Sequence, residues 1–164
     1  MQHLASFEIR PINSNDAEKV VTIMGQYWGS TRVVSKGKVY YPEKLPGFVA
    51  TIGDESVGLL TYEIKNGQCE VVTLNSASEG LGIGSGLLEA VRKVAISAWC
   101  KRLWLITTND NTHALKFYQK RGFRLAALYP NQLEKSRLLK PEIPLVGMDG
   151  IPLRDEIELE IPLS

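Results

Sequence analysis

The chain has 164 residues, enough for one domain with a hydrophobic core and too few for two ordinary domains. Hydrophobic residues make up 44% and charged residues 23% of the chain, which is the balance of a soluble globular protein. The formal net charge is +1, which gives no support for binding to bulk nucleic acid or to a membrane surface.

Cysteine and histidine usage gives no support for a metal site. Cys69 and Cys100 lie in apolar runs and fit no metal or redox spacing, so we expect buried free thiols. His3 and His113 are far apart in the chain, which excludes a histidine-rich metal site. The first residues lack the pattern of a signal peptide, and no apolar run is long enough to span a bilayer. We therefore expect a cytoplasmic protein without a metal.

The first quarter of the chain predicts a strand and a helix. Residues 7–12 alternate apolar and polar side chains, which predicts a strand. Asn15 is expected to cap the following helix, with Glu18 three residues later as in a capping box. Residues 28–47 mix turn, basic and aromatic residues, so we expect a long, partly irregular connection there. The apolar stripe of the helix consists of Ala17, Val20, Val21, Met24 and Trp28.

Three strands, a helix and a buried strand are predicted next. Apolar runs at 47–52, 57–64 and 69–74 are separated by short turns and predict consecutive antiparallel strands. The near-continuous apolar run at 102–107 predicts a central strand covered on both faces. The helix between them is expected to bury Leu87, Leu88, Val91, Val94, Ala95 and Ala98.

The last third of the chain predicts a short helix between strands. Residues 109–122 form this helix, with N-cap chemistry at its start and Gly122 suited to its left-handed end. A strand is expected at 123–129, followed by a long connection over 130–154. Strict alternation at 156–161 predicts a strand that closes the sheet at its edge. The order of elements is that of a mixed α/β domain.

The stretch EGLGIGSGLLEAV, residues 79 to 91, lies between a predicted strand and a predicted helix. Free N–H groups and the positive helix end meet phosphates at such a position. The glycine spacing fits neither the dinucleotide fingerprint nor a P-loop, which needs a lysine. A nucleophile elbow is excluded because Ser85 lacks the flanking glycines. We expect Gly80, Gly82 and Gly84 to bind a diphosphate, although plain turn glycines are the alternative.

Two motifs resemble those of the GNAT acetyltransferase superfamily. Glu79-Gly80-Leu81-Gly82-Ile83-Gly84 resembles its acyl-CoA pyrophosphate loop, Gln/Arg-x-x-Gly-x-Gly/Ala. The sequence NTHALKFYQKRGF, residues 111 to 123, resembles its Asn-x-x-Ala-x-x-Phe/Leu-Tyr-x-x-x-Gly-Phe helix. The resemblance covers roughly residues 7–129, and the chain looks like a bacterial subgroup of the superfamily. It implies an α/β GNAT fold, with a mixed, mostly antiparallel central sheet flanked by helices on both faces, in a single domain over residues 1–164.

The resemblance also implies that acetyl-CoA is the cofactor. Backbone groups at 74–76 would contact the pantetheine arm, and Asn111 would point at the cofactor besides capping its helix. Ser85 either adds a hydroxyl to a phosphate or is an ordinary helix residue. Glu79 departs from the family motif, because an anion near a diphosphate is unfavourable; it is expected to turn outward or to pair with Arg92 or Lys93. The implied cofactor-binding set is Leu74, Asn75, Ser76, Glu79, Gly80, Leu81, Gly82, Ile83, Gly84, Ser85, Asn111, Ala114, Phe117 and Tyr118.

Tyr118 and Glu70 are the candidate catalytic residues. The resemblance implies that Tyr118 protonates the departing thiolate, whereas a buried tyrosine with a bonded hydroxyl is the structural alternative. Glu70 is the candidate base because its strand parity places it on one face with Val72 and Leu74. A solvated strand glutamate is an equally good interpretation of Glu70, and Glu63 is a second candidate.

The acceptor pocket is expected to draw on Trp28 and Arg32, on the rest of 28–41 and on 130–154. Arg32 either binds an acceptor carboxylate or is an exposed loop arginine. The implied activity is direct acetyl transfer to the amine of a small molecule or peptide. A CoA-binding sensor or interaction module without catalysis, or transfer of another acyl group, shares the fold and stays open. A homodimer could pair through the edge at 156–161.

Overall fold

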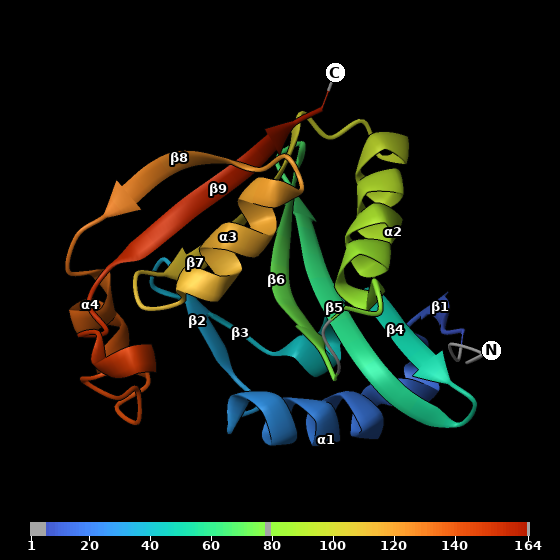
Figure 1. The fold of residues 1–164 in the computed structure, drawn as a ribbon, viewed down its shortest axis with the longest axis horizontal. Coiled ribbons are helices and arrows are strands. Elements are labelled where there is room, and N and C mark those ends of the chain that lie inside the picture. Colours follow the sequence, from blue (N-terminus) through green and yellow to red (C-terminus); the bar gives the residue numbers. More distant parts are fainter. Residues whose placement is uncertain (1–5, 78–79, 164) are drawn as a thin grey trace.

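A seven-stranded sheet forms the centre of the computed structural model, which describes residues 6–77 and 80–163 (Figure 1). The strand order is β1-β4-β5-β6-β7-β9-β8, and all neighbours are antiparallel except the parallel pair β6 and β7. The strands are β1 (Glu8–Pro11), β4 (Gly47–Ile52), β5 (Glu55–Lys65), β6 (Gln68–Ser76), β7 (Arg102–Thr108), β8 (Arg124–Tyr129) and β9 (Glu156–Pro162). A separate two-stranded hairpin joins β2 (Val33–Ser35) to β3 (Lys38–Tyr40).

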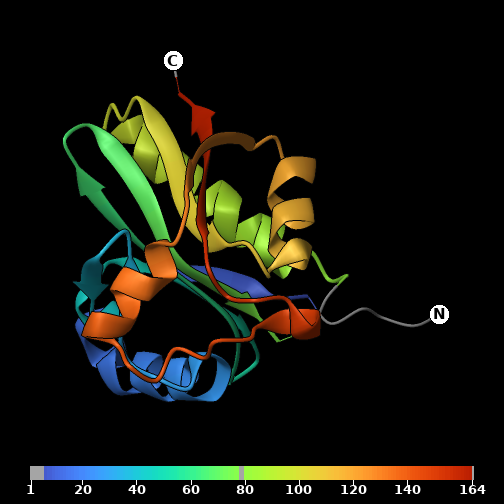
Figure 2. The ribbon, with the colours of Figure 1, turned by 90° about the vertical axis from the view of Figure 1, so that its left-hand side faces the viewer.

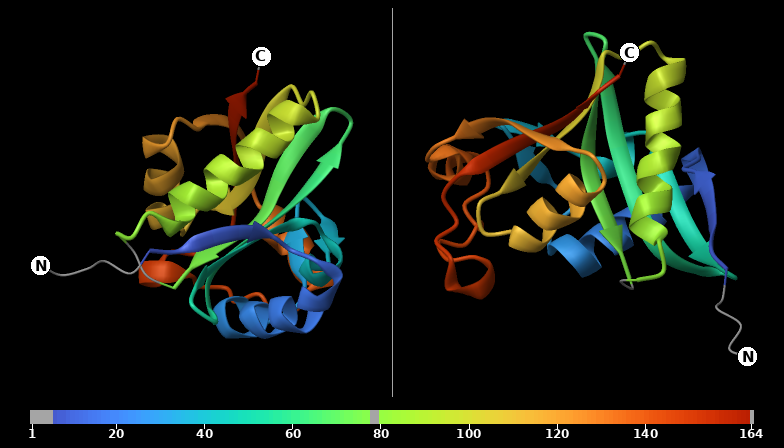
Figure 3. Two further views of the ribbon diagram at one scale, coloured as in Figure 1. Left: turned by 90° about the vertical axis from the view of Figure 1, so that its right-hand side faces the viewer. Right: turned by 45° about the horizontal axis from the view of Figure 1, so that its top comes forward.

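Helices lie on both faces of the sheet, as the views in Figure 3 show. On one face α2 and α3 bury a main core that includes Leu60, Val71, Leu87 and Leu105. On the other face α1 and the β2–β3 hairpin bury a second core around Met24. The helices are α1 (Ala17–Trp28), α2 (Ile83–Ser97), α3 (Thr112–Lys120) and α4 (Gln132–Leu139).

The predicted α/β class, with its mostly antiparallel sheet covered on both faces, is confirmed. Within the described ranges, no helix is long and apolar enough to cross a membrane.

The parallel strands β6 and β7 start side by side and then diverge (Figure 1). Their pairing covers only residues 68–71 of β6 and 102–105 of β7. Beyond this point β6 continues to Ser76 beside β5, and β7 continues to Thr108 beside β9. Main-chain N–H and C=O groups on the facing edges therefore have no strand partners within the described ranges, and α3 lies beside the opening.

A β-bulge in β6 lies at the point of divergence. Thr61 pairs with Thr73 while Tyr62 pairs with Val71, so Val72 has no partner of its own on β5. The extra residue changes the alternation of side chains along the strand. Val71 and Leu74 consequently pack on the main core, although they are three positions apart, and Val72 packs on the second core.

Several predicted boundaries differ from the observed ones. The capping box is formed by Asn13 and Asp16 in a 3-10 turn (Ser14–Asp16), so the predicted pair of Asn15 and Glu18 is wrong. Ala98 is exposed because it lies beyond the last turn of α2. Strand β7 is central as predicted but is not buried on both faces, since only Leu103 and Leu105 are fully buried.

The two predicted connections contain regular elements, and the last strand lies in a different place. Residues 28–47 include the β2–β3 hairpin, and 130–154 includes α4, which lies beside β2 (Figure 2). Strand β9 lies between β7 and β8 and is hydrogen-bonded on both sides. The prediction of an edge strand at 156–161 is therefore wrong, and this strand cannot pair across a dimer.

Candidate functional site

A cleft of about 820 Å³ opens between the N-terminal turn of α2, the diverging end of β6 and one side of α3. Its lining residues are Leu74, Asn75, Ser76, Gly80, Gly82, Ile83, Gly84, Ser85, Asn111, His113, Ala114, Lys116, Phe117, Tyr118, Lys120 and Arg121. The structure thus brings together nearly all the side chains predicted to bind a cofactor. Leu81 is the exception, because it packs against the main core, and Glu79 lies outside the described residues.

The glycine turn leaves the start of α2 open to the cleft. Gly82 is the N-cap residue with φ of +79°, a left-handed conformation that glycine adopts without strain. It has no side chain with which to cap the helix, and the first main-chain bond runs from Gly86 N–H to Gly82 C=O at 2.9 Å. The N–H groups of residues 83–85, which precede this bond in the first turn of α2, therefore lack intrahelical acceptors and are suited to an anion.

Gly84 is glycine for a different reason. It lies inside α2, and a Cβ atom built there would be 2.9 Å from Cζ of Phe117. The absent side chain lets the Phe117 ring of α3 pack against the first turn of α2. Gly82 and Gly84 thus have different roles, with Gly82 setting the backbone conformation and Gly84 permitting close helix packing.

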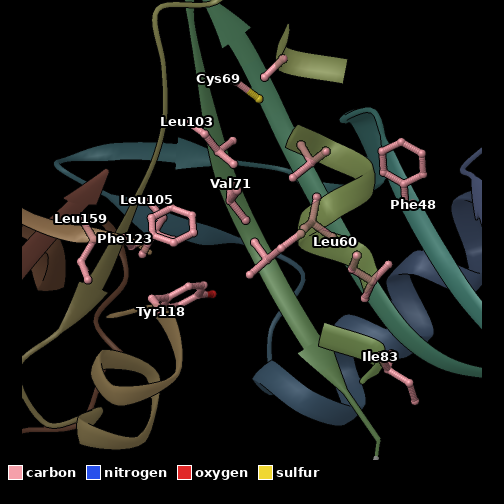
Figure 4. Close-up of a cluster of buried hydrophobic side chains, with 14 of the residues drawn as sticks. Phe48, Leu60, Cys69, Val71, Ile83, Leu103, Leu105, Tyr118, Phe123 and Leu159 are labelled. Atoms are coloured by element: carbon pink, nitrogen blue, oxygen red, sulfur yellow. The ribbon is translucent and has the colours of Figure 1, made fainter. Parts of the chain in front are cut away.

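Tyr118 is buried at the inner end of the cleft, with 9% of its surface exposed. Its ring packs edge-on against Phe117 and Phe123, at centroid distances of 5.2 and 5.4 Å. Figure 4 shows its hydroxyl oxygen on the side of β6. This hydroxyl has no hydrogen-bond partner among residues 6–77 and 80–163, which removes the alternative of a bonded core tyrosine. Burial raises the pKa of Tyr118, so the group stays protonated and can donate.

Glu70 lies on the opposite face of the sheet from the main core. The parity argument that placed it with Leu74 is wrong, because the bulge at Val72 intervenes. Its carboxylate accepts hydrogen bonds from the Tyr40 hydroxyl at 2.5 Å and from the Ser35 hydroxyl at 3.1 Å. Burial raises the pKa of Glu70, although these two bonds favour its charged form. A solvated strand glutamate is therefore not what the structure shows, since Glu70 is 4% exposed.

Glu63, the second candidate base, is bound to a lysine. Its carboxylate lies 2.6 Å from the Lys38 ammonium, near the end of β6 that is paired with β7. Together with Glu70 it lines a smaller hollow of about 280 Å³ between the β2–β3 and β5–β6 hairpins. Glu63 lies on β5, so it is farther than Glu70 from the point where β6 and β7 diverge.

The two segments predicted to form the acceptor pocket do meet. The Arg32 guanidinium lies 3.1 Å from a Glu142 carboxylate oxygen, and the Lys140 ammonium donates to the Arg32 carbonyl at 3.0 Å. Trp28 does not line the cleft itself, but its indole N–H donates from α1 to Oδ1 of the lining residue Asn75 at 3.4 Å. The Asn75 amide nitrogen is buried without a partner in the described ranges, so its two N–H donors are unused at the junction of the two faces of the sheet.

Three buried glutamates hold the tip of the β2–β3 hairpin. Ser35 donates to Glu70, the Lys36 main-chain N–H donates to both oxygens of Glu156 at 3.3 and 3.4 Å, and the Lys36 ammonium lies 3.4 Å from Glu158. Glu158 also pairs with Arg102 at 2.7 Å. Glu156 has no such ion pair in the described part of the chain, and burial raises its pKa from 4.5 to about 7.

Replacing Glu156 with Gln is expected to stabilise the protein at pH 8. The raised pKa means that the folded state binds this proton more tightly than the unfolded state, so stability falls as pH rises from 4.5 to about 7. The neutral Gln amide oxygen can still accept from the Lys36 main-chain N–H. It does not ionise, so up to about 3 kcal/mol of the loss in unfolding free energy is avoided. Urea unfolding at pH 5 and pH 8 measures the free energy of unfolding of both proteins. An equal change between the two pH values in variant and wild type would contradict the prediction.

Glu160 provides the matched control for that measurement. Its carboxylate pairs with Arg124 at 2.9 Å and with Arg102 at 3.1 Å, and these bonds lower its pKa. The sign is therefore reversed, because stability from this group is present above its unfolded pKa and is lost as pH falls. Glu160→Gln is expected to lower stability at pH 8, where Glu156→Gln raises it.

The cations of the cleft were not predicted from the sequence. Lys116, Lys120 and Arg121 all line it from α3. The sequence did contain a signal, since positions 113, 116, 117, 120 and 121 recur at helical spacing on one side of a helix that also carries Tyr118. Lys120 and Arg121 also suit the C-terminal end of a helix, where cations are favoured, and this simpler explanation conceals their position in the cleft.

Comparison with known proteins identifies the family. The sequence profile of the acetyltransferase (GNAT) family matches residues 20–123. The chain is 42% identical over 150 residues to the uncharacterized protein YdhI of Bacillus subtilis (strain 168), covering 91% of this chain and 94% of YdhI. It is 44% identical over 135 residues to the uncharacterized protein YxbD of the same organism, covering 82% and 85% of the two chains.

Solved structures show the same fold. A GNAT family acetyltransferase from Elizabethkingia anophelis, with acetyl-CoA bound, superposes with a TM-score of 0.66 at 22% identity, covering 96% of this chain and 98% of that one. Fold, motifs and sequence relatives therefore agree, and the chain belongs to the GNAT acetyltransferase family.

Proposed function

We propose that the protein is an acetyl-CoA-dependent N-acetyltransferase, folded as one domain over residues 1–164. It moves an acetyl group to the amine of a small molecule or peptide. The observation that carries the proposal is the placement of Tyr118, which lines the cleft where β6 parts from β7 and whose hydroxyl has no hydrogen-bond partner in the described part of the chain. The cleft fits CoA chemically, because open N–H groups at the start of α2 suit a diphosphate. The Elizabethkingia relative, which has acetyl-CoA bound, supports this choice.

The two faces of the sheet have different tasks in this proposal. The cleft beside α2 and α3 would hold acetyl-CoA, and the diverging ends of β6 and β7 would face its acetyl group. The unpaired edge of β6 supplies main-chain donors, among them the Leu74 N–H for the developing oxyanion. Tyr118 delivers its proton to the sulfur as the C–S bond breaks.

The acceptor approaches from the opposite face, beside Glu70, Trp28 and Arg32. Glu70 takes the proton that the amine loses, directly or through a water molecule. Tyr40 and Ser35 fix the carboxylate in one orientation. Arg32 can exchange its exposed partner Glu142 for an acceptor carboxylate, since exposed ion pairs contribute only about 0–1 kcal/mol.

Glu70→Gln is expected to lower kcat/KM by about 10²-fold at neutral pH, the low end for general base catalysis. In the wild type, kcat/KM falls as pH decreases through the raised pKa of Glu70, because the base becomes protonated. The variant lacks this acidic limb, while cofactor affinity is unchanged. Glu63→Gln is the control and keeps wild-type kcat/KM. A variant at position 70 that retains the full acidic limb would show that another group is the base.

An acceptor screen tests the proposed function. Acetyl-CoA is incubated with the protein and a panel of amines, amino acids and peptides, and the released thiol is followed. Turnover with an amine supports the proposal. Tight CoA binding without turnover on any acceptor favours a non-catalytic CoA-binding module, and turnover only with longer acyl-CoA favours another acyl group.

A further inference from the structure

The positive charge of the cleft comes from one wall. The described part of the glycine turn, residues 80–85, carries no charged side chain. Opposite this turn, α3 presents Lys116, Lys120 and Arg121, and the described lining residues include no carboxylate. A ligand with several phosphates would therefore meet neutral N–H groups on one side and three cations on the other.

Arg121 is held in position by both helices. Its Nε–H donates to the Ser85 hydroxyl in the first turn of α2 at 2.7 Å, and one terminal nitrogen donates to the Phe117 carbonyl at 2.9 Å. The guanidinium lies 3.6 Å from the centroid of the Phe117 ring. A guanidinium has five N–H donors, so about three remain for a ligand once these two bonds are made.

We propose that the α3 wall, formed by Lys116, Lys120 and Arg121, binds the phosphates of the cofactor and supplies the charge that the glycine turn lacks. This inference rests on the proposed use of acetyl-CoA. Arg121 is the anchor, because a fixed planar fork suits phosphate oxygens, while the two lysines act as mobile point charges. Ser85 orients Arg121 and so connects the start of α2 to the wall.

Calorimetric titration with CoA and with 3′-dephospho-CoA tests the wall without an acceptor. Arg121→Gln and the double variant Lys116→Gln/Lys120→Gln remove its charges. Each is expected to weaken CoA binding by about tenfold or more, since a charge-assisted hydrogen bond contributes about 1.5–3 kcal/mol. Lys93→Gln, an exposed residue of α2 outside the cleft, keeps wild-type affinity. Thermal unfolding confirms that the exposed substitutions leave the fold intact.

The two ligands identify which phosphate each residue contacts. Substitution of a residue that binds the diphosphate lowers the affinity for both ligands equally. Substitution of a residue that binds the 3′-phosphate lowers the affinity for CoA alone. Either result supports the wall. Wild-type affinity for both ligands in both variants overturns it. If the wild type binds CoA while the variants are unaffected, only the wall fails. If the wild type binds neither ligand, the proposed cofactor use fails with it.

Discussion

Tyr118→Phe is expected to lower kcat by about 10²–10⁴-fold while the dissociation constant of CoA stays within about twofold of wild type. The substitution removes one oxygen, whose hydroxyl has no partner in the described ranges, so no buried group loses a hydrogen bond. The ring keeps its contacts with Phe117 and Phe123. Stability should therefore be unchanged, and the loss falls on proton transfer to the thiolate.

Steady-state kinetics on the acceptor found by the screen measure this effect, with calorimetry for CoA affinity. Tyr62→Phe is the matched control, because Tyr62 packs against the same core and stacks on Phe48 outside the cleft. It is expected to retain wild-type kcat. Wild-type turnover in Tyr118→Phe would assign the proton to another donor, such as water, and leave Tyr118 a packing residue.

Local motifs made the cofactor side of the site predictable. Asn111 caps α3 by accepting from the Ala114 N–H at 3.0 Å, as its residue type and position indicated. Tyr118 faces the cleft, and Gly82 begins α2 in the conformation that only glycine adopts easily. For the cap and for Gly82 the determining residues lie within one turn of the chain, whereas the position of Tyr118 is indicated by the resemblance of residues 111–123 to the family helix.

Features that depend on distant partners could not be predicted in this way. The bulge at Val72 depends on the register with β5, where the Thr61 and Thr73 hydroxyls lie 2.7 Å apart, and no pattern within β6 indicates it. Strand β9 does alternate polar and apolar side chains. Its polar face is not solvated, however, because Lys36, Arg102 and Tyr129 cover it. The alternation therefore predicts an edge strand, although β9 lies between two neighbours.

The acceptor side was the least predictable part for a related reason. Strands β2 and β3 have three residues each, too short for a periodic signal, and their position is fixed by Glu70, Glu156 and Glu158 from other elements. The pairing of Arg32 with Glu142 joins residues 110 positions apart. Such contacts arise only after the sheet has assembled, so the sequence indicated the segments but not their geometry.

Gly82→Val is expected to weaken CoA binding by about 100-fold or more, equivalent to about 2.7 kcal/mol. The φ of +79° is unfavourable for a β-branched residue, so the turn must shift and carry the first N–H groups of α2 out of position. Apart from its chain neighbours, no heavy atom of the described residues lies within 4 Å of the added Cβ, so core packing is not disturbed. Unfolding should therefore show a loss of only about 1–3 kcal/mol from backbone strain.

Gly53→Val separates the loss of binding from the strain. Gly53 also has a left-handed φ, of +59°, with open space around its Cβ position, but it lies in the turn between β4 and β5 away from the cleft. Both substitutions therefore carry similar strain, and only the one at Gly82 should affect calorimetric CoA binding. Equal affinities in the two variants would mean that the start of α2 does not hold the diphosphate, because strain alone would then explain every change observed.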